Sequence, residues 1–138
     1  MIAYVDTSVP LRILLGQPRR LRQWGRWERG YTSELMGVEI RRVLDRLRLA
    51  CVLDDEGLAS AHEKCARIES ALGRVDVTRT VLQRAGLPMP TAVKTLDALH
   101  LASALILQER IEDRLVFATH DAQQAVAARA LGFLCIGA

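Results

Sequence analysis

The sequence predicts an α/β fold in which a parallel sheet is covered by helices on both faces. Short apolar segments, such as residues 2–5 and 114–119, alternate along the chain with longer segments of helical periodicity. This alternation indicates a parallel sheet, because each connecting helix returns the chain to the same end of the sheet. The length of 138 residues suits one domain, and no repeat or linker divides it. We therefore expect a single domain over residues 1–138.

In the N-terminal half, the elements follow from apolar spacing and from residues that begin or end helices. Ser8 is a fair N-cap, and the run Gly16-Gln17-Pro18 breaks the helix that it begins. We expect a strand at 2–5, helices at 8–15 and 19–28, an extended link at 31–33, a long helix at 33–49 and a helix at 54–73.

The C-terminal half continues the alternation. Pro88 and Pro90 end one helix, and the next helix is apolar on almost every side, which indicates a buried helix. We expect a strand at 74–78, a helix at 78–87, the buried helix around 94–105, a strand at 114–119, a helix at 120–132 and a last strand at 133–137.

Cysteine usage and hydropathy favour a cytoplasmic protein. The three cysteines are far apart and odd in number, so they fit neither a disulfide set nor metal-ligand spacing: Cys51, Cys65 and Cys135. No signal peptide is visible after Met1, and no apolar run reaches the roughly 18 residues of a membrane span. We expect no membrane association.

Positive charge is concentrated in the first 50 residues, which hold ten arginines against five acids. The densest part is residues 19–30, "RRLRQWGRWERG". Arginine and tryptophan together suit phosphate backbones and stacked bases, so this segment is a candidate RNA-binding site. An amphipathic helix with Leu21 and Trp24 packed inward is the simpler explanation, and taken alone the segment favours it. The candidate residues are Arg19, Arg20, Arg22 and Arg26.

Four acids occupy positions where acids are unexpected. Asp6 and Asp121 follow predicted strands, and the carboxyl ends of parallel strands form the usual ligand crevice. Asp97 begins the buried helix, and Glu39 lies in mid-helix on the apolar side. Capping could explain Asp6, Asp97 or Asp121 singly, but it cannot explain Glu39. Together they predict one acidic cluster.

Such a cluster requires a cation or protons. Two carboxylates about 4 Å apart repel by roughly 4 kcal/mol at an effective dielectric constant of 20. That is comparable with the stability of a small domain. Oxygen ligands favour Mg²⁺ or Mn²⁺, which can activate a water and stabilise the charge on a phosphate. The pattern therefore predicts phosphodiester hydrolysis.

Four stretches of the chain resemble the PIN-domain ribonucleases, and most closely the VapC-type toxins of bacterial VapBC toxin–antitoxin pairs. They are "YVDTS", "TSELMGVEIRRVL", "TLDALHLASAL" and "FATHDAQQAVAARALGF", in the family's order. The resemblance covers nearly the whole chain, and "LDALHLASA" is its most specific part.

The resemblance implies a three-layer α/β/α fold with a five-stranded parallel sheet. It implies a metal-dependent endoribonuclease toxin of a type II toxin–antitoxin system, with Mg²⁺ or Mn²⁺ as cofactor. Its partners would be an RNA substrate, a cognate antitoxin and a second copy in a homodimer. By matching motifs, Asp6, Glu39, Asp97 and Asp121 take the catalytic and metal-binding positions, and Ser8 and Thr119 support them.

Two histidines lie near the motifs, and His120, between Thr119 and Asp121, is not a usual family ligand. We expect His120 to face solvent and His100 to be a hydrogen-bonded core residue. Two other functions stay open from the sequence. One is a catalytically silent PIN-like module that binds RNA or protein. The other is a phosphoacceptor receiver domain, which Asp6 standing alone and the absence of any lysine after Lys94 disfavour.

Overall fold

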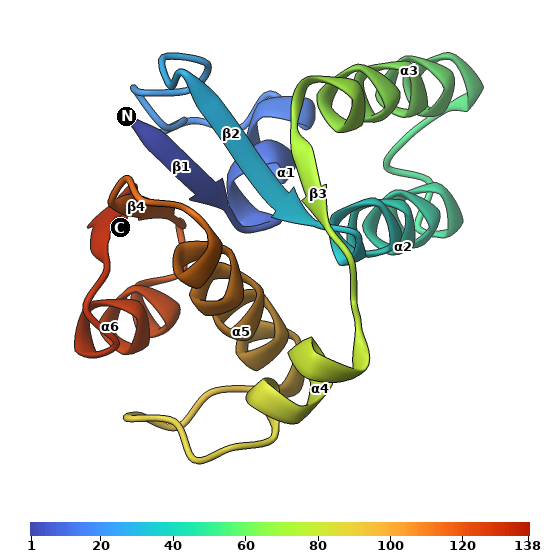
Figure 1. Cartoon of the computed structure of the whole chain (residues 1–138). Coiled ribbons are helices and arrows are strands. Elements are labelled where there is room, and N and C mark those ends of the chain that lie inside the picture. Colours follow the sequence, from blue (N-terminus) through green and yellow to red (C-terminus); the bar gives the residue numbers. More distant parts are fainter.

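The computed structural model describes residues 1–138 and contains a five-stranded parallel sheet with six helices (Figure 1). The strand order is β3-β2-β1-β4-β5, and every neighbouring pair is parallel. The predicted three-layer α/β/α class is confirmed. The strands are β1 (Ile2–Val5), β2 (Arg29–Ser33), β3 (Gly73–Val75), β4 (Leu115–Ala118) and β5 (Leu134–Ile136).

The helices connect consecutive strands and lie on both faces of the sheet (Figure 1). The long predicted helices are present, and the helix that begins with Asp97 in its first turn is continuously buried from Ala98 to Ala104. None of the helices combines the length and the apolar character that a membrane crossing needs. The helices are α1 (Ser8–Leu14), α2 (Leu35–Leu49), α3 (Asp55–Ala71), α4 (Arg79–Ala85), α5 (Thr95–Arg110) and α6 (Ala122–Ala130).

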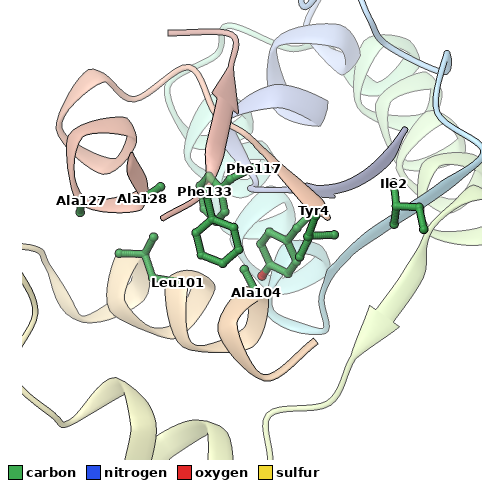
Figure 2. Packing of buried hydrophobic residues seen from close by; sticks show 9 residues of the cluster. Ile2, Tyr4, Leu101, Ala104, Phe117, Ala127, Ala128 and Phe133 are labelled. Carbon is green, nitrogen blue, oxygen red and sulfur yellow. The ribbon is translucent and has the colours of Figure 1, made fainter. Parts of the chain in front are cut away.

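The central strand β1 divides the core between the two faces, because successive side chains of a strand point in opposite directions. Ile2 and Tyr4 pack with residues of α5, β4 and α6. Figure 2 shows the Tyr4 ring in this cluster, above α5 and close to Phe117, with which it stacks at 5.4 Å between ring centroids. Ala3 and Val5 pack on the other face with Val9 of α1.

Two predicted elements differ from the structure. Residues 19–28 form turns instead of a helix, and both Arg19 (φ +59°) and Gly25 (φ +74°) have left-handed backbone conformations that end helical geometry. Leu21 is buried against Ala3 and Val5, so this segment is held by an anchor into the core. The predicted link at 31–33 is part of β2, which pairs with both β1 and β3.

Candidate active site

All four predicted acids line one hollow of about 600 Å³ at the carboxyl ends of the central strands. Asp6 follows β1, and Asp121 lies three residues beyond the end of β4, the neighbouring strand. Glu39 is in the second turn of α2, and Asp97 is in the first turn of α5. Segments separated by up to 115 residues thus bring four carboxylates to the rim and floor of the same cavity.

Asp6 is the most firmly held of the four acids. Its side chain is buried, and both carboxylate oxygens accept hydrogen bonds. Oδ1 accepts from the backbone N–H of Ser8 (2.7 Å) and from the Ser8 hydroxyl, while Oδ2 accepts from Thr119 Oγ1 (2.6 Å). Burial raises the pKa of the Asp6 carboxyl above its ordinary value, against the lowering effect of these hydrogen bonds.

Glu39 is held through one oxygen only. Its Oε1 accepts from Thr7 Oγ1 (2.8 Å) and contacts Nε2 of His100 at 2.6 Å. Oε2 takes part in no hydrogen bond. Thr7, just after β1, and His100, on α5, therefore fix the Glu39 side chain through Oε1. The second oxygen, Oε2, stays able to bind a ligand.

Asp97 is held least. Only its backbone carbonyl accepts a hydrogen bond, from Gln124 Nε2 at 3.4 Å. Partial burial raises the pKa of the Asp97 carboxyl, and the negative charges of Asp121, Asp6 and Glu39 raise it further. A carboxylate without donors and with three acidic neighbours is electrostatically unfavourable unless a cation joins the cluster.

Asp121 combines a capping role with a place in the hollow. It is the N-cap of α6, and its Oδ1 accepts from the backbone N–H groups of Gln123 (2.8 Å) and Gln124 (3.1 Å). Both of these hydrogen bonds go to one oxygen, so Oδ2 is outside the cap. The residue is exposed at the mouth of the hollow.

The chemistry of this donor set fits a hard divalent cation. The four acids offer only oxygen ligands, three of them through oxygens without a donor, and no lysine or arginine salt bridge neutralises them. In the side-chain conformations of the structure, however, no three acids or other ligating residues form a compact set around one point. Cation binding would therefore require rotation of the less restrained side chains, Asp97 and Asp121.

Two arginines that the sequence interpretation overlooked also line the hollow. Arg42 and Arg46 lie three and seven residues after Glu39 on α2, on the same helical face. Both are exposed, and Arg42 pairs with Asp45 at 3.4 Å. This helical spacing was the signal that could have identified them. The hollow thus has an acidic floor and a basic side.

The arginines proposed from the sequence are elsewhere. A separate hollow of about 650 Å³ is lined by Arg19, Arg20 and Arg22, together with Trp24. Arg26 is exposed in the same turn-rich segment but lines neither of these two hollows. None of the four arginines reaches the acidic hollow.

The two histidines have different environments. His100 is buried and, as expected, hydrogen-bonded; its partners are Tyr4 in the core and Glu39 in the acidic hollow. His120 is partly buried instead of facing solvent, with Nδ1 2.8 Å from the Gly137 carbonyl oxygen. Its backbone N–H donates to Ser8 Oγ, which ties the end of β4 to the Asp6 turn.

The structure disfavours a receiver domain. An acceptor site would need an aspartate after the third strand near Asp6, but β3 is an edge strand separated from β1 by β2. Asp76 follows β3 directly, and it lines a different cavity, with Tyr31 and Arg110.

Comparison with known proteins shows the family of the chain. The family model described as PIN domain matches residues 3–130. The chain belongs to the PIN domain family. The resemblance seen in the sequence motifs is thereby confirmed, and all four acids lie within the matched range of this PIN domain. The chain is also similar to Ribonuclease VapC47 of Mycobacterium tuberculosis (strain CDC 1551 / Oshkosh), with 28% identity over 95% of this chain and 93% of the relative.

Proposed function

We propose that this PIN domain is a metal-dependent endoribonuclease, the toxin of a type II toxin–antitoxin pair. The observation that carries the proposal is the convergence of Asp6, Glu39, Asp97 and Asp121 on one hollow, with no lysine or arginine salt bridge to any of the four. The similarity to Ribonuclease VapC47 supports RNA as the substrate and a VapC-type toxin as the class.

The four acids would hold Mg²⁺ or Mn²⁺, the cations that prefer oxygen ligands. When bound, such an ion supplies an activated water and charge stabilisation for a phosphodiester. The protein's own contribution is positional. Ser8 and Thr119 keep the Asp6 carboxylate fixed, and the α2 and α5 helices fix the backbones of Glu39 and Asp97. No amino-acid nucleophile is required.

RNA binding would use positive charge around this acidic site. Arg42 and Arg46 lie on the same face of α2 as Glu39, so they are suited to contact backbone phosphates next to the acidic site. We keep Arg19, Arg20, Arg22 and Arg26 as a second, more distant phosphate-binding surface.

The proposed class brings three further expectations. A toxin of this kind would be inhibited by a cognate antitoxin protein and would form a homodimer. It would act in the cytoplasm, where the three free cysteines of this chain would stay reduced: Cys51, Cys65 and Cys135.

The direct experiment is cleavage of end-labelled RNA by the purified chain without antitoxin. We expect internal cuts with Mg²⁺ or Mn²⁺ and none in EDTA. Cleavage undiminished by EDTA would contradict the metal mechanism. Tight RNA binding without any cleavage, across metals, would instead favour a catalytically silent module.

A further inference from the structure

A buried chain of hydrogen bonds connects the hydrophobic core to the acidic hollow. Tyr4, on β1, places its hydroxyl 2.8 Å from Nδ1 of His100, on α5. Nε2 of the same ring lies 2.6 Å from Oε1 of Glu39, on α2. Figure 2 shows the Tyr4 hydroxyl directed towards α5. Three elements from distant parts of the sequence therefore meet through one imidazole.

The direction of each hydrogen bond follows from the groups involved. A carboxylate can only accept, so the proton between His100 and Glu39 belongs to Nε2. In the neutral ring Nδ1 is then an acceptor, and the Tyr4 hydroxyl donates to it. Tyr4 keeps its proton, because burial raises the pKa of the phenol far above its ordinary value. The two buried residues thus define one orientation of the imidazole.

The consequence is an asymmetric Glu39. Oε1 receives both donors, His100 Nε2 and Thr7 Oγ1, while Oε2 receives none. The His100 ring is only 2% exposed, so its nitrogens are bonded by protein side chains and not by solvent. Both ring nitrogens are bonded to side chains, Tyr4 on one side and Glu39 on the other, so the ring is fixed in the orientation that faces Glu39.

We propose that His100 is a positioning residue for Glu39: oriented by Tyr4, it holds Oε1 so that Oε2 is available to a divalent cation. This inference rests on the proposed function, because it assumes that the acidic hollow binds Mg²⁺ or Mn²⁺. Hydrogen-bonded partners behind a metal-binding carboxylate typically contribute 10–100-fold to metal affinity or activity.

The experiment compares two amide substitutions of His100. A glutamine amide reaches about as far as Nε2 and can still donate to Glu39, whereas an asparagine amide reaches only about as far as Nδ1. We expect His100→Asn to raise the Mn²⁺ dissociation constant of the full chain by about 10–100-fold, measured by titration calorimetry, and His100→Gln to stay within about threefold of wild type.

Leu99→Ala is the matched control for general destabilisation. Leu99 is buried beside His100 in sequence but packs with Val81, Ala102 and Ile106, away from the hydrogen-bond chain. The Leu99→Ala substitution should lower the melting temperature and leave the Mn²⁺ affinity unchanged. A second readout is the ¹⁵N spectrum of His100, which should show a protonated Nε2.

The outcomes separate the two proposals. If wild type binds Mn²⁺ and His100→Asn binds it equally well, or if His100→Gln loses as much affinity as His100→Asn, the positioning role is overturned while the metal site stands. An Nε2 without a proton also overturns it. If wild type binds no Mn²⁺ at all, the proposed function fails, and this inference fails with it.

Discussion

The two sides of the acidic hollow are built differently. On one side, Asp6 and Glu39 are held by donors from Ser8, Thr119, Thr7 and His100. On the other, Asp97 has no donor to its carboxylate, and Asp121 is exposed and uses one oxygen to cap α6. The sequence motifs contain all four acids alike, but their physical environments separate Asp97, which is unanchored, from the three acids whose carboxylates accept hydrogen bonds.

This difference makes it possible to separate the contribution of a carboxylate to folding stability from its contribution to activity. An anchored carboxylate contributes to folding through its hydrogen bonds, whether or not a cation is present. An unanchored carboxylate among other acids lowers stability until a cation binds. Both kinds should be required for activity, and only the first should be required for the fold.

The largest expected effect is on cleavage, where the two sides should behave alike. Asp6→Asn and Asp97→Asn should each lower the cleavage rate by more than about 100-fold, since indirect partners of a metal ligand alone contribute up to that much. Asp76→Asn is the matched control, because Asp76 also follows a parallel strand but lines another cavity. Near-normal cleavage by either site variant would remove that residue from the mechanism.

Stability without metal should separate the two sides. In EDTA near neutral pH, Asp6→Asn loses a hydrogen bond, because an amide cannot accept at both positions now occupied by Ser8 and Thr119, and this costs about 1–3 kcal/mol. Removal of a buried charge whose pKa is raised offsets part of that cost, so Asp6→Asn should be clearly less stable than Asp97→Asn. Asp97→Asn loses no hydrogen bond and removes one repelling charge, so it should be at least as stable as wild type. Urea unfolding measures both. Equal destabilisation by the two substitutions would show that the division is wrong.

The two basic surfaces, one beside the acidic hollow and one at residues 19–26, can also be compared by substitution. Changing Arg42 and Arg46 to glutamine should raise KM for RNA and flatten its salt dependence by about 0.7 per lost phosphate contact on a log–log plot. The second surface consists of Arg19, Arg20, Arg22 and Arg26. Replacing all four with glutamine should weaken RNA binding and flatten its salt dependence without changing kcat.

Arg67→Gln with Arg79→Gln removes the same charge as the Arg42 and Arg46 pair, from exposed positions outside both hollows. It should leave the salt slope unchanged. If the fourfold variant also keeps the wild-type slope, residues 19–28 have a structural role only, through the buried anchor Leu21.

The smallest expected effect is on pH dependence. The pKa of Asp97 is raised above its ordinary value of 3.8, so the folded protein binds its proton more tightly than the unfolded chain does. The resulting stability is present below pH 3.8 and is lost as the pH rises through the raised pKa. Metal-free wild type should therefore lose stability relative to Asp97→Asn between about pH 4 and neutrality. If the difference in stability between wild type and Asp97→Asn stays constant over this pH range, the raised pKa does not belong to Asp97.

Much of the fold and the position of the acids could be predicted from local sequence features. Asp6 and Asp121 follow apolar strands, and parallel strands end at one side of a sheet. Glu39 was conspicuous because a mid-helix acid on an apolar stripe has no capping role. Helical spacing would also have identified Arg42 and Arg46, which share its face.

The unpredicted parts depend on contacts between distant residues. His100 meets Glu39 across 61 positions of sequence and Tyr4 across 96, and no local periodicity encodes such a meeting. Likewise, residues 19–28 contain a helix-like apolar pattern, but burial of Leu21 against β1 and the left-handed Gly25 override it.

On the proposed function, the acidic hollow binds a divalent cation and Asp97 is placed there for it. Four melting curves test this directly: wild type and Asp97→Asn, each in EDTA and in Mn²⁺. A bound ion stabilises by RT ln(1 + [L]/Kd), about 2.7 kcal/mol at a hundred times Kd, so Mn²⁺ should raise the wild-type melting temperature clearly and that of the variant much less. If Mn²⁺ stabilises both proteins equally or neither, or if the substitution destabilises the metal-free form while RNA cleavage survives, Asp97 is a structural residue and the account is contradicted.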